Sequence, residues 1–289
     1  MSSNSTRTRA LVGALALAGL LAATPAGAAP NTGKIAFSGG MDVTTAYFFR
    51  GILQERNGFI GQPYLEVGAN VYENEGGFLS SLTLLGGTWA SVHSEETGNS
   101  GTGAPALYEL DFYGGVTAGL GDYVEAGASY VIYTSPNNAF SAVQEVDFTL
   151  GLDDSEFLGA FAMSPSVLFA IETENTAYGS EQGTYFEAGV EPGFNLIPGE
   201  RYPVDLSFPI TFGFSIEDYY EDERGDDELW GYGSFGLMAS VPLAFIGEDY
   251  GSWSFTGGAT AFIFNSNLKQ TNDDDSPWVV GTFGIAAAY

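Results

Sequence analysis

Twelve segments of alternating side chains, separated by clusters of turn-forming residues, constrain this chain more than any other feature. Each covers roughly 12 to 18 residues, longer than the five or six residues usual in soluble sheets. The segments are 35–52, 60–73, 78–92, 107–120, 123–134, 142–152, 157–174, 183–197, 204–219, 229–246, 252–265 and 278–289. An even number of such strands predicts a single antiparallel transmembrane β-barrel, which needs about 9–11 residues per tilted strand.

The clearest alternation lies in segment 204–219. One face is apolar and carries Val204, Leu206, Phe208, Ile210, Phe212, Phe214 and Ile216. The opposite face is mostly polar and carries Asp205, Ser207, Pro209, Thr211, Gly213, Ser215 and Glu217. In a membrane barrel the apolar face meets lipid and the other face lines the lumen.

The last segment, 278–289, alternates up to Tyr289. Its pattern places Phe283, Ile285 and Tyr289 on the lipid face. With twelve strands, this segment is expected to pair with 35–52 and seal the sheet. An aromatic end on a lipid-facing strand is also the pattern expected of a signal read by the barrel-insertion machinery.

The beginning of the chain predicts export. Its parts are a positive region with Arg7 and Arg9, an apolar run over Ala10–Ala23, and the small residues Ala26-Gly27-Ala28. This order is typical of a cleaved signal peptide, here residues 1–28, which leaves a mature barrel over 29–289. No later stretch is long and apolar enough for a transmembrane helix. The predicted location is therefore the bacterial outer membrane, with membrane lipid as a partner.

The composition excludes several classes of protein. The 36 carboxylates against 8 basic residues disfavour nucleic-acid binding, which depends on cationic contacts to phosphate. The absence of cysteine excludes disulfides and thiolate metal sites. Hydrophobic residues make up 45% and aromatic residues 15%, so the acidic chain is expected to fold rather than stay disordered. No motif predicts a cofactor.

The connections between segments alternate in length. The longer ones are 53–59, 93–106, 135–141, 175–182, 220–228 and 266–277; the shorter ones are 74–77, 121–122, 153–156, 198–203 and 247–251. External loops and periplasmic turns of a barrel differ in this way, which places both termini in the periplasm. Aromatic residues near segment ends suggest interfacial girdles: Tyr47, Phe48, Phe49, Tyr219, Tyr220, Trp230, Tyr232, Trp253 and Trp278. Strand length, girdles and the aromatic end disfavour a soluble β-sandwich.

The face opposite the lipid assigns eleven charged residues to the lumen. They are Asp42, Arg50, Glu66, Glu109, Asp111, Glu125, Glu145, Asp147, Glu187, Asp205 and Glu217. All but Arg50 are carboxylates, and a narrow tube lined in this way concentrates cations and repels anions. The alternative is a hydrated lining with no selected role, because any such lumen must be polar.

Arg50 and the inward glycines have structural interpretations as well. Because a buried charge persists only when paired, Arg50 is expected to meet an acid on segment 60–73 or 278–289 and to fix register. The small inward residues are Gly115, Gly119, Gly127, Gly151, Gly189, Gly213, Gly258 and Gly284. They indicate either an open, narrow bore or room for inward Tyr113, Tyr133 and Tyr185.

Short patterns between residues 42 and 136 follow an order shared with a known family. They are Asp42-Val43-Thr44-Thr45-Ala46-Tyr47-Phe48-Phe49-Arg50-Gly51-Ile52, Gln62-Pro63, Gly77-Phe78, Thr88-Trp89-Ala90-Ser91, Glu109-Leu110-Asp111-Phe112-Tyr113-Gly114 and Tyr130-Val131-Ile132-Tyr133-Thr134-Ser135-Pro136. They resemble the TorF-type family of outer-membrane porins, whose opening signature is Tyr-x-x-Arg-Gly. The resemblance implies a barrel and, by its label, transport, with no known substrate or site. The acidic loops 216–228 and 271–275 depart from it.

The predicted function is an outer-membrane porin for passive diffusion of small hydrophilic solutes, with a preference for cations. A barrel-borne lipase or protease is the first alternative. Such an enzyme needs a base, and the single histidine, His93, lies near Ser91 and Ser94 at the start of a long loop. Neighbouring residues on a strand point apart, so we expect no enzyme.

A structural or adhesive barrel with calcium-binding loops is the second alternative. Acidic loop residues offer hard oxygen ligands, with the candidates Asp226, Asp227, Asp273, Asp274 and Asp275. Their spacing matches no defined calcium loop, and a solvated acidic loop is favoured.

Overall fold

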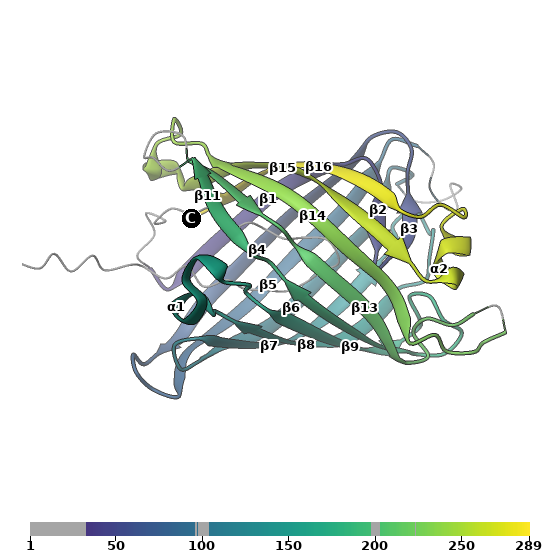
Figure 1. Ribbon diagram of the computed structural model, residues 1–289, viewed down its shortest axis with the longest axis horizontal. Coiled ribbons are helices and arrows are strands. Elements are labelled where there is room, and N and C mark those ends of the chain that lie inside the picture. Colours follow the sequence, from purple (N-terminus) through teal and green to yellow (C-terminus); the bar gives the residue numbers. More distant parts are fainter. Residues whose placement is uncertain (1–32, 96, 98–103, 198–202, 223) are drawn as a thin grey trace, which may run out of the picture.

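The computed structural model describes residues 33–95, 97, 104–197, 203–222 and 224–289, which form one closed antiparallel barrel (Figure 1). Around the barrel, its twelve described strands are β1 (Ile35–Thr44), β4 (Ile60–Glu73), β5 (Leu79–His93), β6 (Leu107–Leu120), β7 (Val124–Thr134), β8 (Val143–Leu152), β9 (Ser166–Glu174), β10 (Thr184–Val190), β13 (Ile210–Glu217), β14 (Trp230–Pro242), β15 (Ser252–Phe264) and β16 (Trp278–Ala288). Two short strands extend this sheet, β11 (Gly193–Ile197) after β10 and β12 (Val204–Ser207) before β13. The predicted signal peptide, 1–28, lies outside the described residues.

The first and last strands seal the sheet as predicted. β16 pairs with β1 in antiparallel register, with Asp42 opposite Gly284. Just past the end of β16, Phe37 and Tyr289 exchange two backbone hydrogen bonds of 2.8 Å each. Closure matters because lipid offers no partner to the unpaired N–H and C=O groups of a sheet edge.

The outer surface of the sheet is apolar. Exposed outward side chains include Phe37, Leu65, Leu84, Phe112, Phe148, Leu237 and Phe283. The predicted lipid-facing residues of the last segment are also exposed, with Phe283 at 56%, Ile285 at 41% and Tyr289 at 50%. An apolar outer surface around a closed sheet is the surface that a bilayer requires.

The two ends of the barrel differ. The long-loop end carries the connections 45–59, 94–106, 135–142, 175–183, 218–229 and 265–277, and α2 (Ser266–Thr271) lies there. The opposite, short-turn end holds the chain's C-terminus, α1 (Ser155–Leu158), η1 (Gly159–Phe161) and η2 (Glu248–Tyr250) (Figure 1). No helix in the described residues has the length and apolar character needed to cross a membrane.

Four predicted segments depart from continuous strands. Segment 183–197 is interrupted at Glu191-Pro192, between β10 and β11. Segment 35–52 leaves the sheet after Thr44, and residues 47–55 form a separate hairpin of β2 (Tyr47–Phe49) and β3 (Ile52–Glu55). Segment 157–174 begins in helical turns and becomes a strand only at Ser166. Segment 204–219 is broken at Phe208-Pro209, since proline has no N–H to donate to the ladder.

The girdle prediction is wrong for most of the aromatic residues. Tyr47, Phe48, Phe49, Tyr219, Tyr220 and Tyr232 are each 8% exposed or less. Trp278 lies opposite Phe262 and contacts Phe48 ring to ring at 5.6 Å. Aromatic residues at the long-loop end therefore fill the lumen instead of forming a belt at the membrane surface.

Candidate functional site

The hairpin β2–β3 folds into the barrel from the long-loop end (Figure 1). Its turn is Arg50-Gly51, with φ of 47° and 80°, between the paired residues Phe49 and Ile52. Two consecutive positive φ values define the type I′ turn that suits two-residue hairpins, where Asn-Gly is usual. Gly51 is required by space as well, because a Cβ there would lie 2.8 Å from the Tyr232 side chain. Arginine at the first position costs about 1–3 kcal/mol of backbone strain.

The contacts of the Arg50 guanidinium offset that strain. Arg50 is 2% exposed and donates two hydrogen bonds to the carboxylate of Glu145 on β8, at 2.6 and 3.0 Å. It donates a third, of 3.0 Å, to the Tyr219 hydroxyl. The rings of Tyr185, Phe49 and Tyr219 surround it, with centroids 4.4, 5.0 and 5.4 Å from the guanidinium carbon. We call Glu145, Tyr133, Tyr185 and Tyr219 the guanidinium cage; Tyr133 donates a 2.5 Å hydrogen bond to Glu145.

Further contacts hold the backbone of the turn. The Tyr220 hydroxyl donates to the Arg50 carbonyl at 2.8 Å. Asn272, which follows α2, accepts from Leu53 N at 2.9 Å and donates to the Gly51 carbonyl at 2.8 Å. The helix begins at an N-cap, where the Asn265 side chain accepts from Leu268 N.

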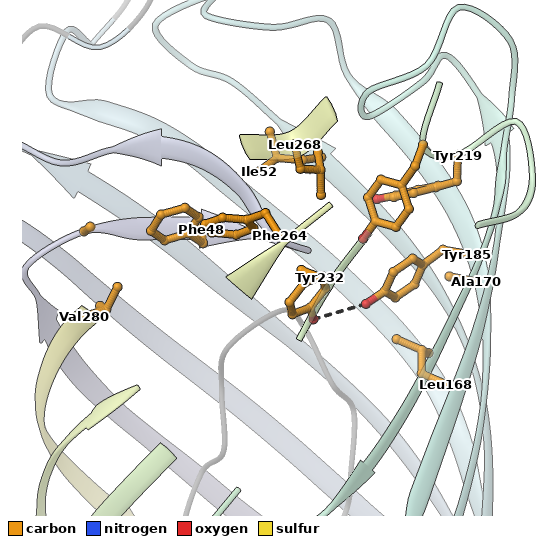
Figure 2. Packing of buried hydrophobic residues seen from close by; sticks show 12 residues of the cluster. Phe48, Ile52, Leu168, Ala170, Tyr185, Tyr219, Tyr232, Phe264, Leu268 and Val280 are labelled. Carbon is orange, nitrogen blue, oxygen red and sulfur yellow. Dashed lines mark hydrogen bonds between the residues drawn. The ribbon is translucent and has the colours of Figure 1, made fainter. Parts of the chain in front are cut away.

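The two strands of the hairpin also contact the barrel wall. Figure 2 shows Phe48 against Phe264, and their ring centroids are 5.5 Å apart. On the other side, the Tyr47 hydroxyl donates to Glu109 at 2.9 Å, and Tyr108 bonds Gln54. The lumen-facing side chains at this level have almost no exposed surface; Val131, Tyr133, Glu145, Tyr185 and Ser215 are exposed by 0, 2, 0, 0 and 0%. Protein therefore fills the long-loop half of the lumen.

The wall around the hairpin is acidic. Glu109, Asp111, Glu145 and Asp147 are all inward and buried, with at most 4% exposed. One oxygen of Asp111 and one of Asp147, both Oδ1, have no hydrogen-bond partner. Among the lysines and arginines that the structure describes, only Arg50 is buried. This half of the lumen therefore holds more acidic than basic side chains.

The short-turn half of the lumen is different. Asp42, Glu66, Glu125 and Asp205 are inward and half-buried, so solvent reaches them. Glu66 accepts from the Tyr113 hydroxyl at 3.1 Å, and Asp205 accepts from Asn195 Nδ2 at 2.8 Å. Glu187 is half-buried between the two halves and accepts from the hydroxyls of Tyr185 and Tyr232.

Two of the eleven predicted lumen residues are placed differently from the prediction. Glu217 follows a register shift in the β10–β13 pairing, lies opposite Thr184 and is exposed, so it is not part of the lining. Arg50 lies inside the barrel but on the hairpin, and its partner is Glu145 instead of an acid on 60–73 or 278–289. The hairpin carries Arg50 away from its neighbouring strands, which the alternation alone did not reveal.

The inward glycines make room for aromatic rings in at least one layer. A Cβ on Gly213 would lie 2.3 Å from the Tyr232 ring and 2.8 Å from the Tyr185 hydroxyl. A Cβ on Gly87 would similarly lie 2.4 Å from the ring of Tyr113. The contacts at Gly213 favour the second interpretation of the glycines near the hairpin, where the bore is filled, and Gly87 makes similar room for Tyr113 beside Glu66.

His93 belongs to a hydrogen-bonded chain that sequence reasoning missed. Ser91 and His93 are two residues apart, share the inward face, and join Oγ to Nε2 at 2.8 Å. His93 Nδ1 contacts Thr97 Oγ1 at 2.8 Å, and Thr97 donates to Glu55 of the hairpin. Ser94 is exposed and accepts from Phe59 N. The period of two was the available signal for the Ser91–His93 pair.

Two of the five candidate calcium ligands have side-chain partners within the protein. Asp227 accepts from Ser215 Oγ at 2.5 Å, and Asp273 pairs with Arg56 at 2.5 Å. The backbone N–H groups of Arg224 and Asp226 donate to the carboxylate of Asp222, in the same loop. These hydrogen bonds lower the pKa of the Asp222 carboxyl group. Within the described ranges no group of three or more His, Cys, Asp or Glu residues could hold a metal ion.

The closed sheet, the apolar outer surface and the polar lumen define a membrane-spanning β-barrel of the bacterial outer-membrane type. A family model described as "bacterial protein of unknown function (Gcw_chp)" matches residues 28–200, and the chain belongs to this family. The matched range contains the residues that resemble TorF-type porins. The description of the family gives neither that name nor a transport function. Because the family is bacterial and the fold spans a membrane with strands, the protein is located in the outer membrane.

Solved structures of similar fold include three outer-membrane barrels. The COG4313 outer membrane channel from Pseudomonas putida F1 is 11% identical, with 88% of this chain and 94% of that chain covered and a TM-score of 0.48. The translocator domain of the autotransporter NalP from Neisseria meningitidis is 10% identical. The match covers 90% of this chain and 89% of that chain, with a TM-score of 0.43. LpxR from Salmonella typhimurium is 7% identical. The match covers 86% of this chain and 99% of that chain, with a TM-score of 0.43. Among curated proteins, none matches the chain.

Proposed function

We propose that the protein is a passive outer-membrane channel for small hydrophilic solutes, closed at its long-loop end by hairpin β2–β3. The observation that carries the proposal is the contrast between the two halves of the lumen. Solvent reaches inward Glu66, Thr149 and Gly258 in the short-turn half, whereas the hairpin fills the other half. A twelve-stranded barrel lies between the filled eight-stranded and the open sixteen-stranded barrels, so one hairpin is enough to close it. The resemblance to TorF-type porins points the same way.

A preference for cations is part of this proposal. Asp42, Glu66, Glu125 and Asp205 place four carboxylates along the solvent-reached half. Low-dielectric walls focus their field along the lumen axis, which raises the local concentration of cations.

Ion selectivity tests this proposal. We expect purified protein in a planar bilayer, with a KCl gradient across it, to give a reversal potential of the cation-selective sign. The recording should use the wild type and a loop-replacement variant, in which Asn-Gly replaces residues 46–58; this turn is suitable because Thr44 and Ile60 already pair directly. The triple variant Asp42→Asn, Glu66→Gln, Glu125→Gln should move the reversal potential towards zero.

Glu217→Gln is the matched control because it removes one carboxylate that is exposed outside the lumen. Its reversal potential should equal that of the parent. An anion-selective sign in the parent would contradict the cation preference, and absence of conductance in both folded proteins would contradict the channel.

We further propose that the barrel is not an enzyme. Ser91 and His93 are 0 and 1% exposed, so the pair has no open space in which a substrate could meet the serine. We expect no lipid release and no peptide cleavage from the wild type. Hydrolysis that is present in the wild type and lost in His93→Ala would establish the enzyme instead.

Two partners are proposed on the outer surface. The apolar side chains around the sheet are expected to contact membrane lipid. The lipid-facing Phe283, Ile285 and Tyr289 of the final segment are expected to be recognised by the barrel-insertion machinery during assembly.

A further inference from the structure

The guanidinium cage has the composition of a ligand site. Its carboxylate, Glu145, is 0% exposed and binds Arg50 through both oxygens. Tyr219 adds a hydroxyl acceptor, and the Tyr185 ring lies 4.4 Å from the guanidinium carbon. A planar bidentate carboxylate and aromatic faces are the groups that recognise guanidinium ions, because they match both its fork of donors and its delocalised charge.

The occupant of the cage belongs to a hairpin instead of the barrel wall. Arg50 lies at the tip of the β2–β3 turn in a strained backbone conformation, whereas the cage comes from β7, β8, β10 and the loop after β13. A type I′ turn does not need arginine, since asparagine or glycine is preferred there. Binding of the side chain in the cage therefore accounts for arginine at this position.

The cage also has unused hydrogen-bond acceptors beside it. Asp147 is 2% exposed, interacts electrostatically with both Glu145 and Arg50, and has an unpartnered Oδ1. Asp111, at 1% exposed, interacts with Glu145 and has an unpartnered Oδ1 as well. An uncharged buried oxygen acceptor would already be costly without a donor. Arg50 Nε is also buried without a partner, so a guanidinium ion that is free of the hairpin can turn its N–H groups towards these oxygens and make hydrogen bonds that Arg50 does not make.

We propose that the guanidinium cage is a binding site for small guanidinium cations, which Arg50 occupies as a tethered ligand. A free guanidinium compound that takes the place of Arg50 removes the main polar contact of the hairpin tip. A short tether gives Arg50 an effective concentration on the order of millimolar, so the free cation must be present at comparable or higher concentration to compete. The binding site stands on the contacts alone; its effect on opening rests on the proposed channel function.

The test measures binding of methylguanidinium to protein in detergent, by calorimetry and tyrosine fluorescence. The variant Arg50→Gly empties the cage and suits the positive φ of the turn. We expect it to bind methylguanidinium about 10- to 100-fold more tightly than the wild type, the range that a charged hydrogen-bonded pair contributes. Arg50→Gly combined with Glu145→Gln should lose that gain. Urea, which has a similar shape and no charge, is the ligand control and should not bind.

Equal binding by Arg50→Gly and the wild type would overturn the proposal, and so would equal binding of urea and methylguanidinium. A second measurement does not depend on the variant. In planar bilayers at constant ionic strength, exchanging part of the K⁺ for guanidinium should raise the open fraction of the wild type and leave the loop-replacement variant unchanged. Binding of methylguanidinium to a protein that shows no conductance would support the binding site and contradict the channel function. Conductance that does not respond to guanidinium, together with no binding of methylguanidinium, would support the channel function and contradict the binding site.

Discussion

The loop-replacement variant, with Asn-Gly in place of residues 46–58, is expected to stay open where the wild type is mostly closed. The change removes β2, β3 and the Arg50–Glu145 pair while leaving the pairing of Thr44 with Ile60 intact. Each loss of about 1.4 kcal/mol in the free energy of closing shifts the closed-to-open ratio tenfold. The hairpin contributes several hydrogen bonds and ring contacts, so mean current in a planar bilayer should rise by about tenfold or more.

The variant must be shown to be folded before its current is interpreted. Barrel closure depends on β1 pairing with β16, which the replacement does not touch, and heat-dependent migration on gels reports an intact barrel. A second Asn-Gly replacement, which shortens the 135–142 loop, is the control for shortening a long loop and should leave the current at the wild-type value. An intact loop-replacement barrel with wild-type current would show that the hairpin does not obstruct the lumen.

The alternation of the sequence was sufficient for the barrel but not for the hairpin. Val43 and Phe283 fall opposite each other at the seam because period-two patterning determines which face each strand turns to lipid. The same period continues through Tyr47 and Phe49, where the chain has already left the sheet. Alternation describes a strand and does not say which sheet the strand joins. The signal for a turn was Arg50-Gly51, whose glycine needs a positive φ.

The sequence pattern also placed some lumen residues correctly and others wrongly, because it does not reveal tertiary contacts. Asp42, Glu66 and Glu125 could be assigned inward from the pattern, and the register places them there. These three residues are half-buried, whereas Asp111 and Glu145 are fully buried. The difference depends on how far the hairpin reaches into the barrel, and no local sequence pattern indicates that tertiary contact. Glu217 left the inward face through one register shift, and such a bulge turns the side chains that follow it. The buried aromatic residues were misplaced because rings at strand ends suit either the lumen or the membrane surface.

Glu145→Gln is expected to release the hairpin by leaving Arg50 charged and unpaired. Removing one partner of a buried ion pair costs about 3–5 kcal/mol, whereas removing both costs much less. The chain has no cysteine, so Ile52→Cys places a single thiol on the hairpin at a position that is 7% exposed. We expect its maleimide labelling to become more than about a hundredfold faster in the Glu145→Gln background. Adding Arg50→Gly should reverse most of that increase.

Glu217→Gln, combined with Ile52→Cys, is the control for the loss of a carboxylate, because Glu217 is exposed and touches neither the cage nor the hairpin. Its labelling rate should match that of Ile52→Cys alone. The free-energy coupling between positions 50 and 145, taken from the single and double variants, should exceed about 1 kcal/mol, as residues in direct contact do. Labelling of the Glu145→Gln protein at the parent rate would mean that the hairpin is held by Tyr47, Phe48 and Asn272 without the ion pair. In that case Arg50 would be a strained turn residue whose charge has no part in closing the lumen.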